Sequence, residues 1–161
     1  MTEIKGGGVV LFPGEGRHIV MGGFDVAVLA TAESTGGAYA LLETSEPTTK
    51  GGPPLHIHRD AAESFYVVAG AYSMHLAGQD YHCPPGSYVY VPAGMAHTFR
   101  VLEAGSKKLN LFTPAAMVGY FEELAAAIAS GIDESGLAEI AERHAMEVLG
   151  PAPEDYLSRR D

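Results

Sequence analysis

The sequence predicts an all-β fold, a jelly-roll barrel followed by two C-terminal α-helices. Up to residue 113, short apolar or alternating stretches recur between glycine and proline turns, without a helical period. After Pro114, apolar residues recur at intervals of three and four, as on one side of a helix. We therefore divide the chain into a β-barrel domain, residues 1–113, and a helical tail, residues 114–161, that packs on the barrel.

The expected strands are short and are separated by turn-forming sequences such as PG, GG, GGPP and PPG. Many short strands with such punctuation are typical of barrels and sandwiches rather than of parallel α/β folds. The predicted strands are residues 9–12, 17–21, 24–30, 38–44, 55–58, 64–68, 72–77, 80–83, 87–91, 97–102 and 107–113.

The tail has two predicted helices. The first carries one apolar stripe and ends at Gly131, because glycine readily takes the left-handed conformation that closes a helix. Its stripe consists of Met117, Tyr120, Phe121, Leu124 and Ile128. The second is predicted over residues 134–148, with Gly150 and Pro151 after it. Residues 151–161 are rich in proline and charge, and we expect them to be loosely ordered.

Composition excludes several classes of function. The chain has 161 residues, of which 47% are hydrophobic, enough for the core of one domain. Its net charge of −10 argues against nucleic acid or an anionic membrane as a partner. The single cysteine excludes an internal disulfide and predicts a reducing, cytoplasmic location. No segment approaches the length of a membrane span.

Three histidines and a glutamate stand at spacings that suit one metal ion. His56 and His58 are two residues apart, so on a strand both side chains leave the same face. Glu63 opens the next strand, and His97 follows a turn with the sequence PAG. Three imidazoles and one carboxylate are a complete set of protein ligands for one divalent transition metal ion: Fe, Mn, Ni, Co, Cu or Zn.

These residues resemble the two signature motifs of the cupin superfamily. The first, within residues 51–70, is an HxH pair followed by glutamate and then glycine, here His56, His58, Glu63 and Gly70. The second, within residues 86–101, is glycine, PxG and histidine, here Gly86, Pro92, Gly94 and His97. Two positions depart from the pattern. Gly51 and Gly52 stand closer to the HxH pair than the usual glycine, which predicts a shorter or differently turned entry loop, and Val101 replaces an asparagine.

The tail, with its sequence EVLGPAP, also resembles the C-terminal segment of small bacterial cupins related to quercetin 2,3-dioxygenase. The resemblance implies a metal-dependent dioxygenase acting on a flavonol or a related enol. In such enzymes the glutamate can also act as a base toward a substrate hydroxyl, so Glu63 is a candidate catalytic residue as well as a ligand. Two alternatives stay open: a non-redox isomerase or lyase, and a non-catalytic protein that binds a small ligand.

Residues in phase with the ligands on neighbouring strands should line the pocket. These candidate substrate-binding residues are Phe65, Tyr72, Met74, Phe99 and Val101. Such a lining suits a flat, partly apolar small molecule, with dioxygen as a second partner if the protein is an oxygenase. The resemblance further implies a homodimer, in which the apolar N-terminal region supplies an exchanged strand that covers a sheet edge.

Overall fold

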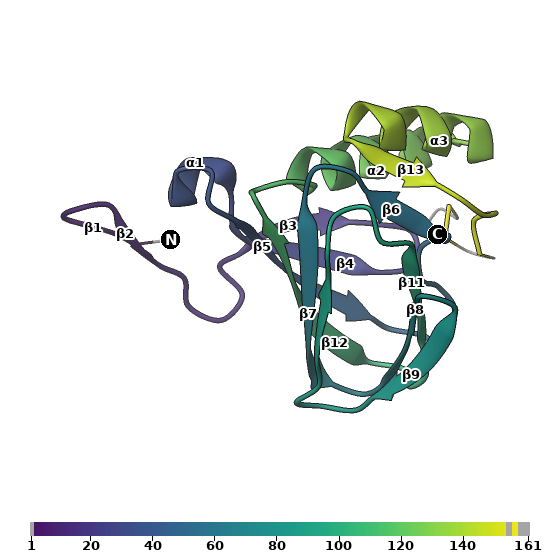
Figure 1. Cartoon of the computed structure of the whole chain (residues 1–161). Coiled ribbons are helices and arrows are strands. Elements are labelled where there is room, and N and C mark those ends of the chain that lie inside the picture. Colours follow the sequence, from purple (N-terminus) through teal and green to yellow (C-terminus); the bar gives the residue numbers. More distant parts are fainter. Residues whose placement is uncertain (1, 154–155, 158–161) are drawn as a thin grey trace.

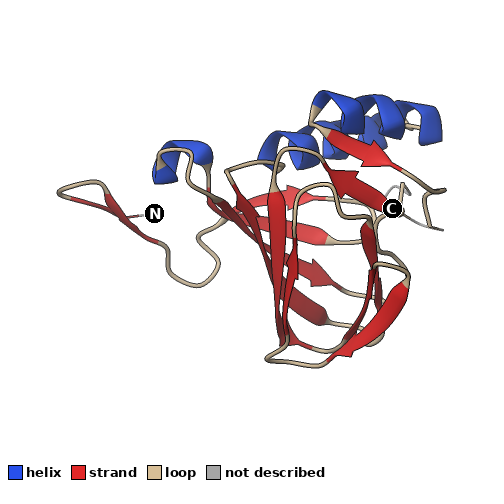
Figure 2. Cartoon of the chain, in the orientation of Figure 1, coloured by secondary structure: helices blue, strands red, loops and turns tan. Residues whose placement is uncertain are grey.

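Two antiparallel sheets face each other in the computed structural model, which describes residues 2–153 and 156–157 (Figure 1). Strands make up most of the regular structure, and two longer helices lie at one end of the barrel (Figure 2). The all-β class with two C-terminal helices is therefore confirmed.

The larger sheet has the order β10-β7-β12-β5-β4-β3 and the smaller one the order β13-β6-β11-β8-β9. The strands of the larger sheet are β3 (Arg17–Val20), β4 (Asp25–Ala30), β5 (Ala40–Glu46), β7 (Ala62–Ala69), β10 (Tyr88–Val91) and β12 (Ser106–Thr113). Those of the smaller sheet are β6 (His56–His58), β8 (Tyr72–Leu76), β9 (Gln79–Cys83), β11 (His97–Val101) and β13 (Met146–Val148). Each stretch expected as a strand from the sequence overlaps one of these strands or β2 (Gly8–Val10).

Alternation along β5 and β12 shows how the larger sheet forms one wall of the barrel. On both strands every second residue is buried and the residues between are only partly covered. Because successive side chains of a strand point to opposite faces, the buried set lines the barrel interior. On β12 this set is Ser106, Lys108, Asn110 and Phe112.

The buried apolar residues form two clusters. The first lies between the larger sheet, β13 and the C-terminal helices, and includes Val26, Leu42 and Phe112. The second lies between the two sheets and includes Phe65, Tyr72, Met74 and Val101. The buried polar residues, described below, stand among these clusters in the barrel interior.

The tail contains α2 (Val118–Ser130) and α3 (Glu134–Arg143). Tyr120, Leu124 and Ile128 of α2 are buried, as the apolar stripe predicts. Gly131 closes α2 in the left-handed conformation, with φ of 86°, so the predicted end of this helix is confirmed.

The second predicted helix was too long. It ends at Arg143, and residues 146–148 form β13, which pairs with β6. Ala145 takes a positive φ of 54°, and its carbonyl accepts a hydrogen bond from the Arg59 N–H at 2.8 Å. The unpaired edge of β6 satisfies the backbone of these residues better than another helical turn would, since a strand edge exposes N–H and C=O groups.

Two short elements were missed at the N-terminal side. The helix α1 (Ala32–Thr35) contradicts the expectation of no helix before residue 114. It has no buried residues and is held by a capping box between Thr31 and Ser34, so no apolar stripe marks it. The strand β1 (Thr2–Ile4) pairs with β2 as a hairpin that stands away from the barrel (Figure 1).

No helix in the part of the chain that the structure describes is both long and apolar enough to cross a membrane.

The motif glycine Gly70 supplies a test of the barrel's packing. It has φ of 69°, and a Cβ there would lie 2.7 Å from Ser106 Cα on β12. We expect Gly70→Ala to lower the free energy of unfolding by about 3 kcal/mol, since left-handed strain and overpacking add. Urea unfolding followed by circular dichroism measures this loss.

The matched control is Gly78→Ala. Gly78 has a similar φ of 78°, but among the described residues nothing lies within 4 Å of the added Cβ. The Gly78→Ala variant should lose only the free energy of the left-handed strain, about 1 kcal/mol of the free energy of unfolding. Equal losses for the two variants would show that the contact with Ser106 is not what requires glycine at position 70.

Candidate metal centre

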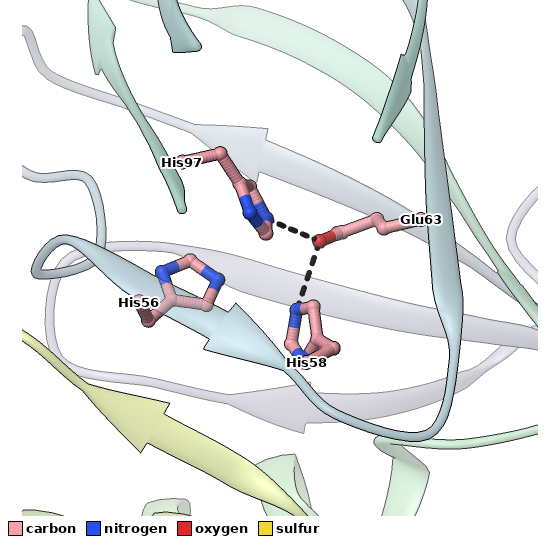
Figure 3. Close-up of side chains that lie close together, drawn as sticks. All are labelled: His56, His58, Glu63 and His97. Atoms are coloured by element: carbon pink, nitrogen blue, oxygen red, sulfur yellow. Dashed lines mark hydrogen bonds and ion pairs between the residues drawn. The ribbon is translucent and has the colours of Figure 1, made fainter. Parts of the chain in front are cut away.

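The four predicted ligands come together inside the barrel (Figure 3). His56 and His58 lie on β6, Glu63 lies on β7, and His97 begins β11. One potential ligand atom from each lies within 4.8 Å of all the others, and all four residues are buried. Both His58 Nε2 and His97 Nε2 lie 3.0 Å from Glu63 Oε2.

Backbone carbonyls fix the orientation of two of the imidazoles. His56 Nδ1–H donates to the Pro54 carbonyl at 2.8 Å, and His97 Nδ1–H donates to the Met95 carbonyl at 2.9 Å. In each case the carbonyl precedes the histidine by two residues, so the loop that leads to the strand sets the ring. Both rings therefore present Nε2 to the centre, which is the arrangement of metal-binding histidines with an outer carbonyl partner.

The loop before β6 is fastened to β11. Thr98 Oγ1 donates to the Pro53 carbonyl at 2.7 Å. Gly52 has φ of 110°, and a Cβ there would lie 2.2 Å from the Phe99 carbonyl oxygen. Only glycine permits this approach, which explains the glycine at position 52.

The strand β6 is held on both sides. On one side it is paired with β11 through a single residue pair, His56 with His97. On the other, β13 pairs with all three residues of β6. The Gly94 N–H, in the turn of the second motif, donates to the His58 carbonyl at 2.8 Å. The tail thus supports the two histidines, a role that the sequence did not reveal.

The charge states of the site follow from burial and these contacts. Burial lowers the pKa of His56 to about 3, and the neighbouring His97 and His58 add to this effect, so its ring stays neutral. Burial opposes ionisation of Glu63, but hydrogen bonds with His58 and His97 outweigh it and lower the pKa of the carboxyl. Burial also opposes protonation of His97, yet its bond with Glu63 prevails and raises its pKa.

These contacts fit a cation. A neutral imidazole has one N–H, and that of His97 is donated to a carbonyl, so its Nε2 directs a lone pair at a carboxylate oxygen. The lone pairs of His97 Nε2 and Glu63 Oε2, whose atoms are 3.0 Å apart, repel each other unless a proton or a metal ion lies between or beside them. With His56 Nε2 also turned inward, the donors are three nitrogens and an oxygen, a set suited to first-row divalent metals.

A cavity adjoins the site. Its volume is about 50 Å³, room for a few water molecules. His56, His58 and Glu63 border one part of it. Aromatic rings from the barrel, the tail and the loop before β4 make up much of the rest: Phe24, Phe99, Phe112, Tyr120, Phe121 and Tyr156.

Of the five residues predicted to bind substrate, the cavity wall contains Phe99. The other four, Phe65, Tyr72, Met74 and Val101, pack together in the apolar cluster between the sheets. Phe99 packs against that cluster, with its ring 6.2 Å from the Phe65 ring between centroids. A direct contact of these four with substrate stays a prediction.

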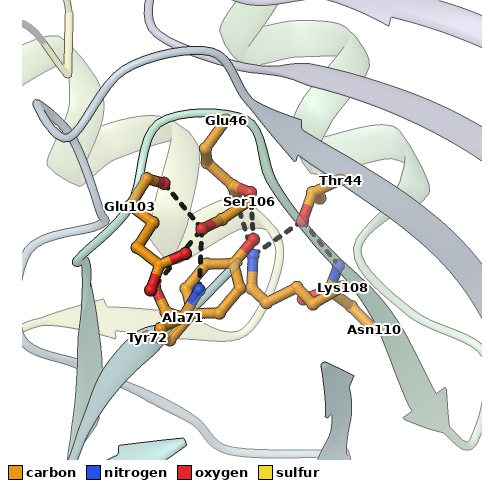
Figure 4. Close-up of polar contacts among 8 residues, drawn as sticks. All are labelled: Thr44, Glu46, Ala71, Tyr72, Glu103, Ser106, Lys108 and Asn110. Carbon is orange, nitrogen blue, oxygen red and sulfur yellow. Dashed lines mark hydrogen bonds and ion pairs between the residues drawn. The ribbon is translucent and has the colours of Figure 1, made fainter. Parts of the chain in front are cut away.

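A buried polar cluster in the cavity wall was missed (Figure 4). Lys108 Nζ donates to Thr44 Oγ1 at 2.6 Å and to Glu46 Oε1 at 2.7 Å, and the Tyr72 hydroxyl donates to Glu46 Oε2. Burial and the Glu46 carboxylate raise the pKa of Tyr72, so its hydroxyl keeps its proton. A signal was present: polar residues occupy the inward phase of β5 and β12, where apolar residues are expected.

The tail also supplies two tyrosines to the cavity. Tyr120 of α2 and Tyr156 are both buried, with their hydroxyl oxygens 3.3 Å apart. Tyr156 stacks on Phe24 at a centroid separation of 6.1 Å. The expectation of a loosely ordered end is therefore wrong at Tyr156, because it buries its ring. Residues 154–155 and 158–161 lie outside the described residues.

Comparisons with known proteins agree with this architecture. Residues 42–111, which contain all four candidate ligands, match the family model of the cupin domain. Quercetin 2,3-dioxygenase of Bacillus subtilis (strain 168) is 28% identical over 127 residues, or 77% of this chain. The match covers 37% of that protein, so the chain spans little more than a third of its length.

Solved structures share the fold at low identity. KdgF from Halomonas sp. is 22% identical with a TM-score of 0.60, over 66% of this chain and 94% of that one. The nucleoside dehydratase Pac13 from Streptomyces is 15% identical with a TM-score of 0.51, over 63% of this chain and 78% of that one. At such low identity these likenesses show a shared fold alone.

The raised pKa of His97 predicts how pH governs metal affinity. Because a metal ion must displace the proton that His97 holds, acidification below this pKa, which lies above the ordinary 6.5, favours the proton. We expect the Kd for Ni²⁺ to rise about tenfold per pH unit as the pH falls from 6 to 5. Calorimetric titration in non-chelating buffers between pH 5 and 8 measures it.

His56, with a pKa of about 3, adds no proton competition over this range. A Kd that stays constant from pH 8 to pH 5 would mean that Ni²⁺ does not bind through His97.

Proposed function

We propose that this chain, which resembles small cupins, is a metal-dependent oxygenase of small enolic molecules, with His56, His58, Glu63 and His97 as the ligands of one divalent ion. The observation that carries the proposal is the convergence of three imidazoles and Glu63 in a buried site beside a cavity. The likeness to a quercetin 2,3-dioxygenase supports the same class of reaction.

The ion, when bound, would supply a Lewis acid and, if redox-active, a route for electrons to dioxygen. Four protein ligands leave two positions free in an octahedral ion, enough for a bidentate enol or for a substrate beside dioxygen. The aromatic wall gives a planar molecule apolar surface to stack on.

Glu63 has two proposed roles. Its lowered pKa keeps it an anion, which suits a ligand. As a base it would be weak, yet the hydroxyl of an enol beside a divalent ion is itself acidic, so a weak base suffices to accept its proton. Glu63 is buried and borders the cavity, which supports this second role.

The size of the cavity favours a small substrate. A volume of about 50 Å³ is far below the several hundred that pockets for drug-sized ligands usually have. A flavonol enters only if side chains of the wall move, whereas a single-ring enol demands a smaller displacement. We therefore propose single-ring or open-chain enols ahead of flavonols.

A non-redox dehydratase, lyase or isomerase is the second candidate. It is supported by the shared barrel of a nucleoside dehydratase and by the charged Lys108 and Glu46 in the cavity wall, which could move protons without an oxidant. A non-catalytic binding protein is the third. The location, which the single cysteine predicts to be cytoplasmic, stays a prediction.

Metal analysis joined to oxygen consumption tests the first candidate. The protein is purified without chelator, analysed for metals, and assayed in an oxygen electrode with quercetin and with small enols. We expect about one ion per chain and oxygen uptake that matches substrate loss. In the variant His56→Ala, metal affinity should fall at least 100-fold, since loss of an outer partner alone costs 10- to 100-fold.

His75→Ala is the matched control, because His75 also pairs with a carboxylate, Asp80, but at the surface. It should keep its metal. Substrate loss without oxygen uptake would favour the second candidate, and tight binding without any change would favour the third. If His56→Ala binds metal as well as the wild type does, the ligand assignment is wrong.

We also propose a homodimer, as the resemblance to cupins implies. The hairpin of β1 and β2 stands away from its own barrel and exposes apolar side chains, among them Ile4, Val9 and Val10. A second copy that covers them would remove this apolar surface from water.

Light scattering after gel filtration should give about twice the chain mass of 16.9 kDa. Replacing Val9 and Val10 by serine should shift the mass toward one chain, whereas serine at the exposed Val20, on the barrel itself, should not. A wild-type mass of one chain at micromolar concentration would contradict the dimer.

A further inference from the structure

We propose that Thr44, Glu46 and Lys108 form a second binding subsite that takes a neutral hydroxyl of the substrate while the substrate's enol end occupies the metal centre. This inference rests on the proposed function, and it narrows the substrate class to small enols that carry a hydroxyl at the end remote from the chelating oxygens.

The first argument is position. Thr44, Glu46 and Lys108 border the same cavity as His56 and Glu63. Glu63 on β7 is paired with Phe112 on β12, and Lys108 lies four residues from Phe112 along the same strand. At about 3.3 Å per residue, the two levels are about 13 Å apart along the sheet. Side chains reach into this interval, and the cavity of about 50 Å³ that they border admits one ring with a short substituent only if residues of the wall move.

The second argument is the free-energy cost of burying the charged groups of this cluster. Lys108 is 1% exposed and Glu46 3% exposed. Taking both charges out of water costs several kcal/mol each, and apolar residues of similar volume would hold this core at least as well. An ion pair whose members both face a cavity is therefore better explained by a ligand than by stability.

The third argument is capacity for hydrogen bonds. Among the described residues, the Lys108 ammonium donates to Thr44 and Glu46, and its third donor has only aromatic rings beside it, those of Phe99 and Tyr72, with centroids 4.0 and 4.9 Å from Nζ. Each Glu46 oxygen accepts one bond, from Lys108 or from Tyr72, although a carboxylate offers about four acceptor sites. A hydroxyl both accepts and donates, so it uses the spare donor of Lys108 and a spare acceptor of Glu46.

The charges of the subsite disfavour a carboxylate or a phosphate as the substrate group that binds there. Glu46 neutralises Lys108 at 2.7 Å, so the subsite has no net charge to offer an anion. An added anion would face the Glu46 carboxylate in a buried site, where repulsion between like charges is strong. The ligand end that carries charge is instead the enolate, which meets the metal centre.

Two pyranones that differ by one oxygen atom test the proposal. Kojic acid and allomaltol are both 5-hydroxy-4-pyranones, with the same chelating oxygens, and carry at position 2 a hydroxymethyl and a methyl group respectively. Calorimetry of Ni²⁺-loaded protein measures the Kd of each. We expect kojic acid to bind about tenfold more tightly than allomaltol, the effect of one or two buried hydrogen bonds.

The variant Lys108→Met/Glu46→Gln removes both charges together, so that neither is left buried alone. In it the preference for kojic acid should fall below twofold, while the Kd of allomaltol changes little. The matched control is Lys107→Met/Glu43→Gln, which removes the neighbouring ion pair of the same two strands on their outer face, with Nζ 3.1 Å from Oε1. It should keep the preference.

If the inner double variant does not fold, the ratio of the two Kd values in the wild type still tests the proposal. Thr44→Val, which keeps the side-chain shape, then serves as the second variant. Equal affinities of the wild type for the two pyranones would overturn the subsite and leave the metal centre standing. So would a preference that survives the inner variants. If neither pyranone binds the Ni²⁺-loaded protein, the chelating mode of the proposed function fails together with the subsite.

Discussion

One carboxylate oxygen shared by two imidazoles determines much of this structure. Glu63 Oε2 lies 3.0 Å from both His58 and His97, inside a barrel where an unpaired charge would be costly. The three residues come from three strands, so the contact exists only if β6, β7 and β11 hold their positions. The loop before β6, the turn before β11 and the tail can all be understood as supports for that requirement.

The supports act through the backbone rather than through further side chains. The strand β6 has three residues and pairs with β11 at one position only, too little to fix two histidines by itself. The tail returns as β13 along its other edge, and the N–H of Gly94 donates to the His58 carbonyl. Carbonyls two residues before His56 and His97 then set the rings, so local loop geometry becomes ligand orientation.

Local spacing explains why the ligands and strands could be predicted from the sequence, and why other parts could not. His56 and His58 share a face through the period of a strand, whatever the rest of the fold does. The strand β13 is different: residues 146–148 continue a helical pattern, and only the distant edge of β6 makes them a strand. Lys108 in a strand suggests an exposed position, and its burial depends on Glu46, a partner 62 residues away. Tyr156 lies in a segment that looks disordered by composition, and its place depends on Phe24.

In the proposed function, the metal centre and the Lys108–Glu46 pair, which both border the cavity, bind different ends of the substrate. With three neutral imidazoles and one carboxylate, a divalent ion would keep a net charge of +1, which favours an anionic enolate at that end. The Lys108–Glu46 pair has no net charge and favours a neutral hydroxyl at the other end, where the Phe99 ring contacts Lys108. The ion and its open positions would decide whether dioxygen takes part, whereas the chain's own side chains decide which molecule is held. Exchange of the metal should therefore change the reaction more than the choice of ligand, and changes at Lys108 should do the reverse.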